Sequence, residues 1–211
     1  MSDSSSAPRS PLNGLRDIWE NGLGQEVRRS AIAFLCIWAI FFAACMVLPD
    51  LRHRLSDMMF ATLGGLNVTD AHGRVSALGL FFNNIQATAV IMLYGLIPFI
   101  QLPALALGMN AMMLGVMAAW YAAEDVSFLA YVAGVLPHGV LELPALFLSF
   151  GMGLYICAQV TRRCRKDKSA LSVWGCMTAA SQVLITVLVP LLFIASFIEA
   201  YVTPLAASLF L

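Results

Sequence analysis

Long apolar segments separated by short polar ones constrain the fold of this chain more than any other feature. Hydrophobic residues make up 60% of the 211 residues and charged residues only 11%, and the mean hydropathy is +0.83. Soluble domains carry about 25% charged residues, whereas a helix that crosses a bilayer needs about 20 apolar ones. The sequence therefore predicts an all-α, polytopic membrane helix bundle in the cell membrane. A formal net charge of zero gives no indication of a nucleic-acid partner.

Five segments are long and apolar enough to be transmembrane helices, and we expect them at about 31–48, 77–97, 102–122, 137–160 and 171–199. Pro49 should end the first span, and Pro190 should kink the last. The apolar stretch at 127–136 is about 15 Å long as a helix, too short to cross alone. We expect a short re-entrant or interfacial helix there, with Pro137 in the first turn of the fourth span. The alternative is one long, broken helix that begins at 127.

Two amphipathic helices are expected outside the spans. Apolar residues recur at steps of three to four between Leu15 and Val27, which indicates a helix lying on the membrane surface or packed on the bundle's own loops. Asp50 can cap a second helix. The apolar face expected for that second helix consists of Leu51, Leu55, Met58, Met59, Thr62, Leu63 and Leu66. The predicted organisation is a cytoplasmic tail with an amphipathic helix at 1–30 and a single transmembrane domain at 31–211.

Basic residues predict the orientation of the bundle. The segment "TRRCRKDK" at 161–168 carries five of them, and Arg28 and Arg29 precede the first span. Basic loops stay in the cytoplasm. Four of the five spans lie between these two basic segments, so both are on the same side of the membrane. We therefore predict a cytoplasmic N-terminus and a C-terminus outside.

Small residues indicate where the helices pack, because lipid supplies no hydrophobic drive between helices and close contact requires small side chains. The residues expected at such contacts are Gly108 and Gly115 in the third span and Ala145, Ser149 and Gly153 in the fourth. His138 and Glu142 continue the row of the fourth span. This polar pair should therefore face neighbouring helices and not lipid.

Polar residues from several spans are expected to meet in the outer half of the bilayer, with Glu142 about 6 Å deeper than His138. The expected intramembrane cluster consists of Asn83, Asn84, Asn110, His138, Glu142 and Glu199. Charged groups at such depth mark a pathway, a site or an internal pair. We interpret the cluster as a structural clasp between helices, and a ligand or substrate site is the alternative. His138, Glu142 and Glu199 could also hold zinc or iron, although no recognised metal-binding spacing supports such a site.

Catalytic motifs are absent from the sequence, which has no GxSxG, no glycine-rich phosphate loop and no carboxylate pair at a defined spacing. The sequence therefore predicts neither an enzyme nor a cofactor.

Four stretches of the sequence resemble the stage II sporulation protein M family: "FFNNIQA", "GMNAMMLG", "LPHGVLELPALFLSFGMGLYI" and "FIEAYVTP". The residues at positions that the family's motifs hold are Asn83, Asn84, Asn110, His138, Gly139, Glu142, Pro144, Glu199 and Pro204. The resemblance covers nearly the whole chain from about residue 30. It implies a membrane scaffold that works with peptidoglycan-degrading partners, with no catalytic activity of its own.

We therefore expect a multi-pass scaffold whose outer face, including 51–66 and 124–136, binds periplasmic or cell-wall-acting proteins. The sequence is also compatible with a homo-oligomer. One rival interpretation is a transporter or channel for a small solute or ion that enters at the polar cluster. Another is an intramembrane metal-dependent enzyme. Transporters usually have internal repeats and a continuous polar path, and the sequence indicates neither.

Overall fold

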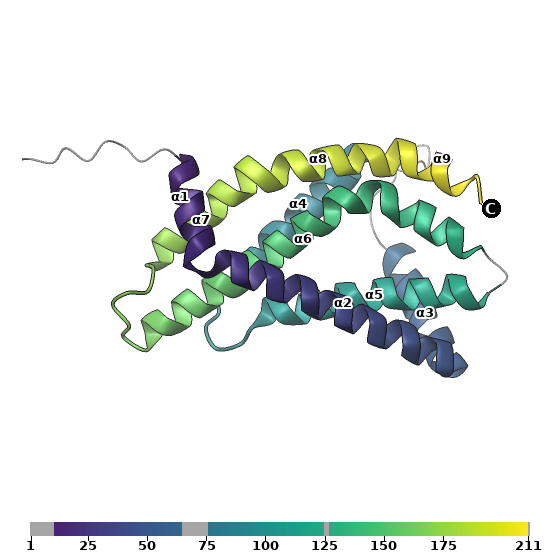
Figure 1. The fold of residues 1–211 in the computed structure, drawn as a ribbon, viewed down its shortest axis with the longest axis horizontal. Helices are drawn as coiled ribbons and strands as arrows, with labels where there is room; N and C mark the ends of the chain where they lie inside the picture. The colour runs from purple at the N-terminus through teal and green to yellow at the C-terminus, as the bar shows by residue number, and fades with distance from the viewer. Residues whose placement is uncertain (1–10, 65–75, 125–126, 211) are drawn as a thin grey trace, which may run out of the picture.

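The computed structural model describes residues 11–64, 76–124 and 127–210, in which the regular elements are all helical (Figure 1). The helices are α1 (Pro11–Ile18), α2 (Gly24–Val47), α3 (Pro49–Gly64), α4 (Ala77–Tyr94), α5 (Leu102–Ala123), α6 (Phe128–Cys164), α7 (Val173–Val183), α8 (Val189–Phe197) and α9 (Thr203–Ala207). Three π-helical turns, η1 (Trp19–Leu23), η2 (Leu184–Leu188) and η3 (Ile198–Val202), join α1 to α2, α7 to α8 and α8 to α9.

Five helical segments in the described residues are long and apolar enough to cross a membrane: Leu15–Val47, Ala77–Tyr94, Leu102–Ala123, Phe128–Cys164 and Val173–Ala207. The predicted all-α bundle with five spans is therefore confirmed. Successive spans run in opposite directions, so the start of α4 and the end of α9 lie at one end of the bundle. The start of α2 and the loop between α6 and α7 lie at the other (Figure 1).

α6 is the central helix of the bundle. It packs against α2, α4, α5, α8 and α9, and in Figure 1 it runs between the α7–α9 segment on one side and α2 and α5 on the other. Half of its most apolar stretch is buried inside the protein, more than in any other span. The polar residues of α6 are therefore placed where they can meet several neighbouring helices.

The start of α6 differs from the first alternative expected from the sequence, in which a separate short helix precedes a span that begins at Pro137. Residues 128–136 do not form a separate re-entrant helix, because α6 continues from Phe128 through Pro137 and Pro144 to Cys164. The second alternative, one long helix from this region, is the observed arrangement, and Figure 1 shows its axis changing direction after the first turns. A proline removes one backbone hydrogen bond and bends a helix. In a bundle, packing against neighbouring helices lets the helix continue past it.

The last span is also longer than the expected 171–199, because the α7–α9 segment stays helical to Ala207. Pro190 and Pro204 lie in the first turns of α8 and α9, directly after the π-helical turns η2 and η3. π-Helix is rare and occurs mostly as a single widened turn inside an α-helix, frequently at functional sites. The distortion expected at Pro190 therefore takes the form of a widened turn, and a second one occurs before Pro204.

The N-terminal amphipathic segment packs on the bundle. Its helix ends at Ile18, and the chain turns at Gly22, whose φ of 125° suits glycine. Leu15 and Ile18 pack against the main apolar core, in which Leu23 is only 2% exposed, and α1 contacts α7. Val27, expected in the same helix, instead belongs to α2. Of the two alternatives for this segment, packing against the protein is the one observed, although the partner is a helix and not a loop.

Pro49 ends the first span as predicted. Leu48, directly before it, leaves the helical region with φ −118° and ψ 89°, as the residue before a proline usually does. α3 then begins at Pro49 and packs against α2 and α5. The observed packing face of α3 differs from the expected one, because Ser56 and Met59 are buried whereas Met58 is 66% exposed. Leu66 lies outside the described residues.

An arginine explains the rotation of α3. The Arg52 side chain, only 12% exposed, lies 3.6 Å from the Glu124 carboxylate at the end of α5 and donates to the Cys45 carbonyl in α2 at 3.5 Å. A charged group held this way fixes which side of α3 faces the bundle. The exposed side then carries Asp50, His53, Arg54 and Asp57.

Small residues lie at close approaches between the helices. A methyl group on Gly115 of α5 would lie 2.6 Å from the Trp38 carbonyl oxygen of α2, and one on Gly153 of α6 would lie 2.8 Å from the Ile91 carbonyl oxygen of α4. Ala145 and Ser149 of α6 are fully buried. Gly108 has room, since a methyl group there would meet only the Ile37 side chain at 3.9 Å.

Two further close approaches between helices involve Gly151 and Gly95. A methyl group on Gly151 of α6 would lie 2.6 Å from the Val27 side chain and 2.8 Å from its backbone. One on Gly95, directly after α4, would overlap the Gly153 carbonyl. Gly151 and Gly153 therefore let α6 contact α2 and α4 at nearly the same level.

Candidate functional site

The side chains of five polar residues meet between α4, α6 and the end of the last span, and we call them the polar cluster: Asn84, His138, Glu142, Glu199 and Thr203. The Asn84 amide donates to Glu142 Oε1 at 3.2 Å. His138 Nε2 lies 3.7 Å from Glu142 Oε2, and His138 Nδ1 lies 3.2 Å from Thr203 Oγ1. The cluster therefore connects three segments that are far apart in the sequence.

Local helix geometry explains why these side chains meet. His138 and Glu142 are four residues apart in α6, so they lie above one another on one face of the helix. Both are mostly buried, with side chains 14% and 21% exposed. Glu199 lies in the π-helical turn η3, and Thr203 is the first residue of α9. Because these two are also four residues apart, both turn toward α6, which packs against η3 and α9.

Two residues expected in the cluster lie elsewhere. Asn83 is exposed on α4, because neighbouring residues of a helix point about 100° apart and only Asn84 faces α6. Asn110 is half-buried in α5, and its amide donates to the Ala106 carbonyl of the same helix at 2.9 Å. Among the described residues, no hydrogen bond joins Asn110 to the cluster.

Sequence reasoning missed Thr203. The signal was present in "EAYVTP", since a threonine four residues after Glu199 should share its helix face. In a helix a threonine hydroxyl often bonds to the carbonyl of its own helix, so the residue type alone does not indicate a contact with another helix. Here the His138 ring lies within hydrogen-bond distance instead.

The polar cluster also has the chemistry of a cation site. His138, Glu142 and Glu199 each offer one ligand atom, and these atoms lie within 4.8 Å of one another. One imidazole and two carboxylates suit a divalent transition metal, and the bond between His138 Nδ1 and Thr203 would orient the ring as in many metal sites. Without an ion, the same side chains already form a hydrogen-bonded link between helices.

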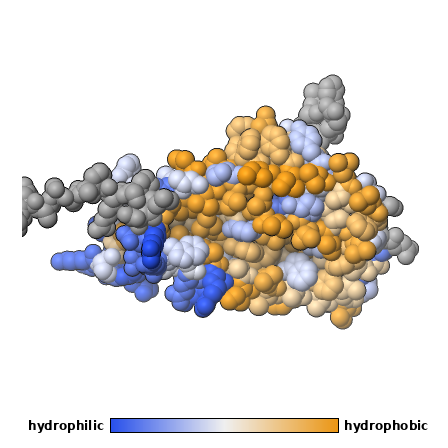
Figure 2. Space-filling model, turned by 45° about the horizontal axis from the view of Figure 1, so that its top comes forward, coloured by the Kyte–Doolittle hydropathy of each residue, from blue (hydrophilic) through white to orange (hydrophobic). Residues whose placement is uncertain are grey.

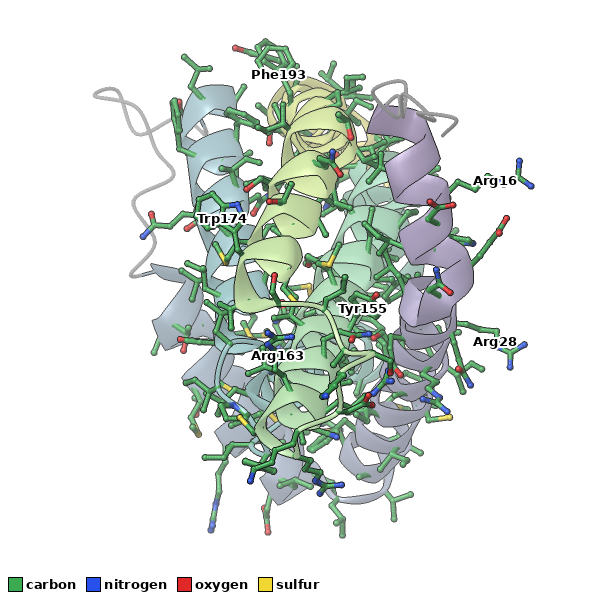
Figure 3. The ribbon with its side chains drawn as sticks, turned by 90° about the vertical axis from the view of Figure 1, so that its left-hand side faces the viewer. Arg16, Arg28, Tyr155, Arg163, Trp174 and Phe193 are labelled. Carbon is green, nitrogen blue, oxygen red and sulfur yellow. The ribbon has the colours of Figure 1, made fainter. Side chains whose placement is uncertain are left out.

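The opposite end of the bundle is basic. Figure 2 shows hydrophilic side chains gathered at the end that carries α1 and the α6–α7 loop, while apolar side chains cover most of the remaining visible surface. Figure 3 looks onto this end, where Arg16 and Arg28 point away from the bundle. Hydrogen bonds from Ser169 and from the Arg162 guanidinium lower the pKa of Asp167 to about 2. The loop that carries the predicted cytoplasmic charges is therefore tied into a defined conformation.

Five apolar spanning helices, joined near one end by buried polar side chains, define a multi-pass helical membrane protein. The family model of Stage II sporulation protein M matches residues 31–204. The chain therefore belongs to this family, as its motifs indicated. Neither a curated protein nor a solved structure matches the chain.

Proposed function

We propose that this protein is a membrane scaffold without catalytic activity, which binds a cell-wall-acting partner through the exposed side of α3. In the proposed orientation the basic end faces the cytoplasm, so α3 lies at the outer surface of the membrane. The family resemblance, which implies peptidoglycan-degrading partners, supports this choice of partner.

The observation that carries the proposal is the fixed position of α3. Arg52 connects it to α2 and α5, and the Phe60 ring packs edge-on against Trp120 of α5 at 5.3 Å between centroids. Its exposed side presents both acidic and basic groups, including Asp50, Arg54 and Asp57. A rigid surface with mixed charges favours specific binding of a protein partner, because charge complementarity selects the partner and its register.

The polar cluster has a supporting role in this proposal. Its hydrogen bonds hold α4, α6 and the last span together in the half of the bundle nearest α3. Interhelical hydrogen bonds in membranes contribute about 0.6 kcal/mol each on average. We propose that the cluster keeps the outer half of the bundle in one arrangement and performs no chemistry.

Site-specific photo-cross-linking in living cells tests the proposal. A photoreactive amino acid in place of Arg54 should give an adduct with a peptidoglycan-acting protein, identified by mass spectrometry. The matched control replaces Ile185, which is 67% exposed on the last span and should contact lipid. Functional variants with the probe at His53, Arg54 or Asp57 that yield no protein adduct would contradict the proposal.

A further inference from the structure

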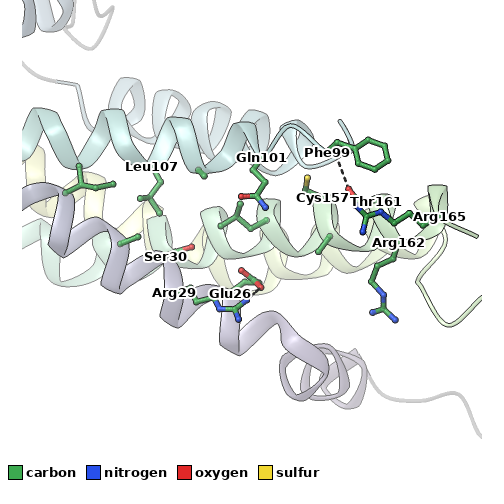
Figure 4. Close-up of a pocket in the computed structure, with 15 residues that line it drawn as sticks. Glu26, Arg29, Ser30, Phe99, Gln101, Leu107, Cys157, Thr161, Arg162 and Arg165 are labelled. Atoms are coloured by element: carbon green, nitrogen blue, oxygen red, sulfur yellow. Dashed lines mark hydrogen bonds and ion pairs between the residues drawn. The ribbon is translucent and has the colours of Figure 1, made fainter. Parts of the chain in front are cut away.

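A cavity of about 650 Å³ lies at the basic end of the bundle, between α2, the start of α5, the end of α6 and the turn before α5 (Figure 4). It exists because small side chains face it from three helices: Ala33 on α2, Ala104 on α5 and Ala158 on α6. Ala33 and Ala158 are exposed even though they line it. The cavity therefore opens at the surface of the spanning region, where lipid can reach it.

The polar end of the cavity is positively charged. Arg29, Arg162 and Arg165 line it together with Glu26, which gives three positive charges against one negative charge and a formal total of +2. Glu26 accepts a 2.7 Å hydrogen bond from Arg29, and Arg162 bonds to Asp167 and Ser169 outside the cavity. Arg165 lies over the Phe99 ring, 5.8 Å from its centroid. An anion at this position would find guanidinium groups already held in place.

A buried hydroxyl provides an independent sign of a ligand. Ser30 is 1% exposed and lines the cavity, and its Oγ is fully buried without a hydrogen-bond partner among the described residues. Leaving such a group unpaired costs about 1–3 kcal/mol. A rotation of the Ser30 side chain would let this unpaired hydroxyl donate to an oxygen bound in the cavity.

The backbone beside the cavity is strained. Phe99 has a φ of 68°, which is an outlier for a bulky residue. Its amide is held by a 3.0 Å hydrogen bond to the Thr161 hydroxyl (Figure 4). Strained residues of this kind often occur at ligand-binding positions. Here the strain places the aromatic ring beneath Arg165, at the mouth of the cavity.

The other end of the cavity is apolar. Ile37, Leu107 and Leu154 line it, and Ile37 lies eight residues beyond Arg29 in α2, about 12 Å further into the membrane. A ligand that fills the cavity must therefore be anionic at one end and apolar at the other.

We propose that the cavity binds one anionic phospholipid, with its phosphate near Arg29, Arg165 and Ser30 and the start of an acyl chain against Ile37 and Leu154. Basic pockets between transmembrane helices are suited to such headgroups. A phospholipid fits better than free phosphate, because free phosphate would leave the apolar end empty. This lipid site would exist whether or not the protein acts as a scaffold.

Native mass spectrometry of the full-length protein in detergent tests this site. The protein should retain one phosphatidylglycerol in preference to phosphatidylcholine. Combined Arg29→Gln and Arg165→Gln substitutions should weaken phosphatidylglycerol binding by about fivefold per arginine, roughly 25-fold in total. Lys168→Gln, which removes a charge from the same basic segment outside the cavity, should change binding by less than about twofold.

A second pair of variants tests the apolar end without changing charge. Ala33→Leu should fill the cavity and reduce phosphatidylglycerol binding, whereas Ala39→Leu, on the exposed surface of the same helix, should not. Equal retention of the two lipids by the wild-type protein would overturn the proposal. So would equal binding by the two leucine variants, or displacement of the lipid by millimolar inorganic phosphate, which would indicate a simple anion site.

Discussion

The close contact between α2 and α5 at Gly115 predicts that a larger side chain at this position lowers the free energy of unfolding. In Gly115→Ala the new methyl group would lie 2.6 Å from the Trp38 carbonyl oxygen and 3.3 Å from the Phe41 Cβ. The closest atom belongs to the backbone of α2, so the helices must separate. Overpacking of this kind costs about 1–3 kcal/mol, while replacing a helical glycine by alanine returns about 0.5–1 kcal/mol. Because the 2.6 Å contact is with backbone, the cost should lie in the upper part of this range, about 2–3 kcal/mol, and we expect a net loss of about 1–2.5 kcal/mol.

Thermal unfolding in detergent, followed by circular dichroism, measures this loss. At about 2–4 °C per kcal/mol for a chain of this size, Gly115→Ala should lower Tm by about 2–10 °C. The control is Gly134→Ala in α6, where a methyl group would meet nothing within 4 Å. In that variant only the stabilisation from replacing a helical glycine by alanine remains, so Tm should rise by about 1–4 °C. If both variants raise Tm, α2 and α5 are not in close contact at Gly115 and the described packing is wrong.

Two further predictions concern the basic end. Alkaline phosphatase fused after Leu211 should be active and the same enzyme fused after Lys168 inactive, and the reverse pattern would contradict the proposed orientation. The bonds to Asp167 should be intact above about pH 4 and be lost as the pH falls through about 2, because a depressed carboxyl pKa stabilises the folded loop only while the group is ionised. Carboxyl NMR titration of the full-length protein should show the pKa of Asp167 rising toward its usual value in Ser169→Ala, and an unchanged pKa would refute the hydrogen-bond explanation.

The sequence predicted those features of the fold that follow from local composition. Apolar length located the five spans, and Pro49 located the end of the first, because both effects act within a few residues of the chain. The same holds for the pairing of His138 with Glu142, whose spacing fixes their common face on any helix.

Other features that depend on partners far along the chain were not predicted, although the meeting of Asn84, Glu142 and Glu199 was. The rotation of α3 follows from Arg52 meeting Glu124, and no local pattern reveals that pair. Pro137 was expected to begin a helix because sequence alone cannot distinguish a bend from an end when packing against neighbours stabilises the bend.

Local sequence also does not determine which polar residues belong to the polar cluster. Two adjacent asparagines in α4 differ only in helix rotation, and tertiary packing turns Asn84 inward and leaves Asn83 exposed. Spacing alone puts Thr203 on the same helix face as Glu199, but its contact with His138 depends on how α9 packs against α6.

The central claim is that the polar cluster is a structural link in a scaffold and not a site of chemistry or transport. Glu142→Gln and Glu142→Leu test it most directly, each measured for Tm in detergent and for complementation of a deletion strain. The Gln variant can still accept the bond from Asn84, so it should keep Tm near the wild-type value and restore function. The Leu variant leaves Asn84 and His138 without this partner and should lose about 1–3 kcal/mol. A Gln variant that is as stable as the wild type but does not complement would contradict the claim, because function would then require the charge of Glu142.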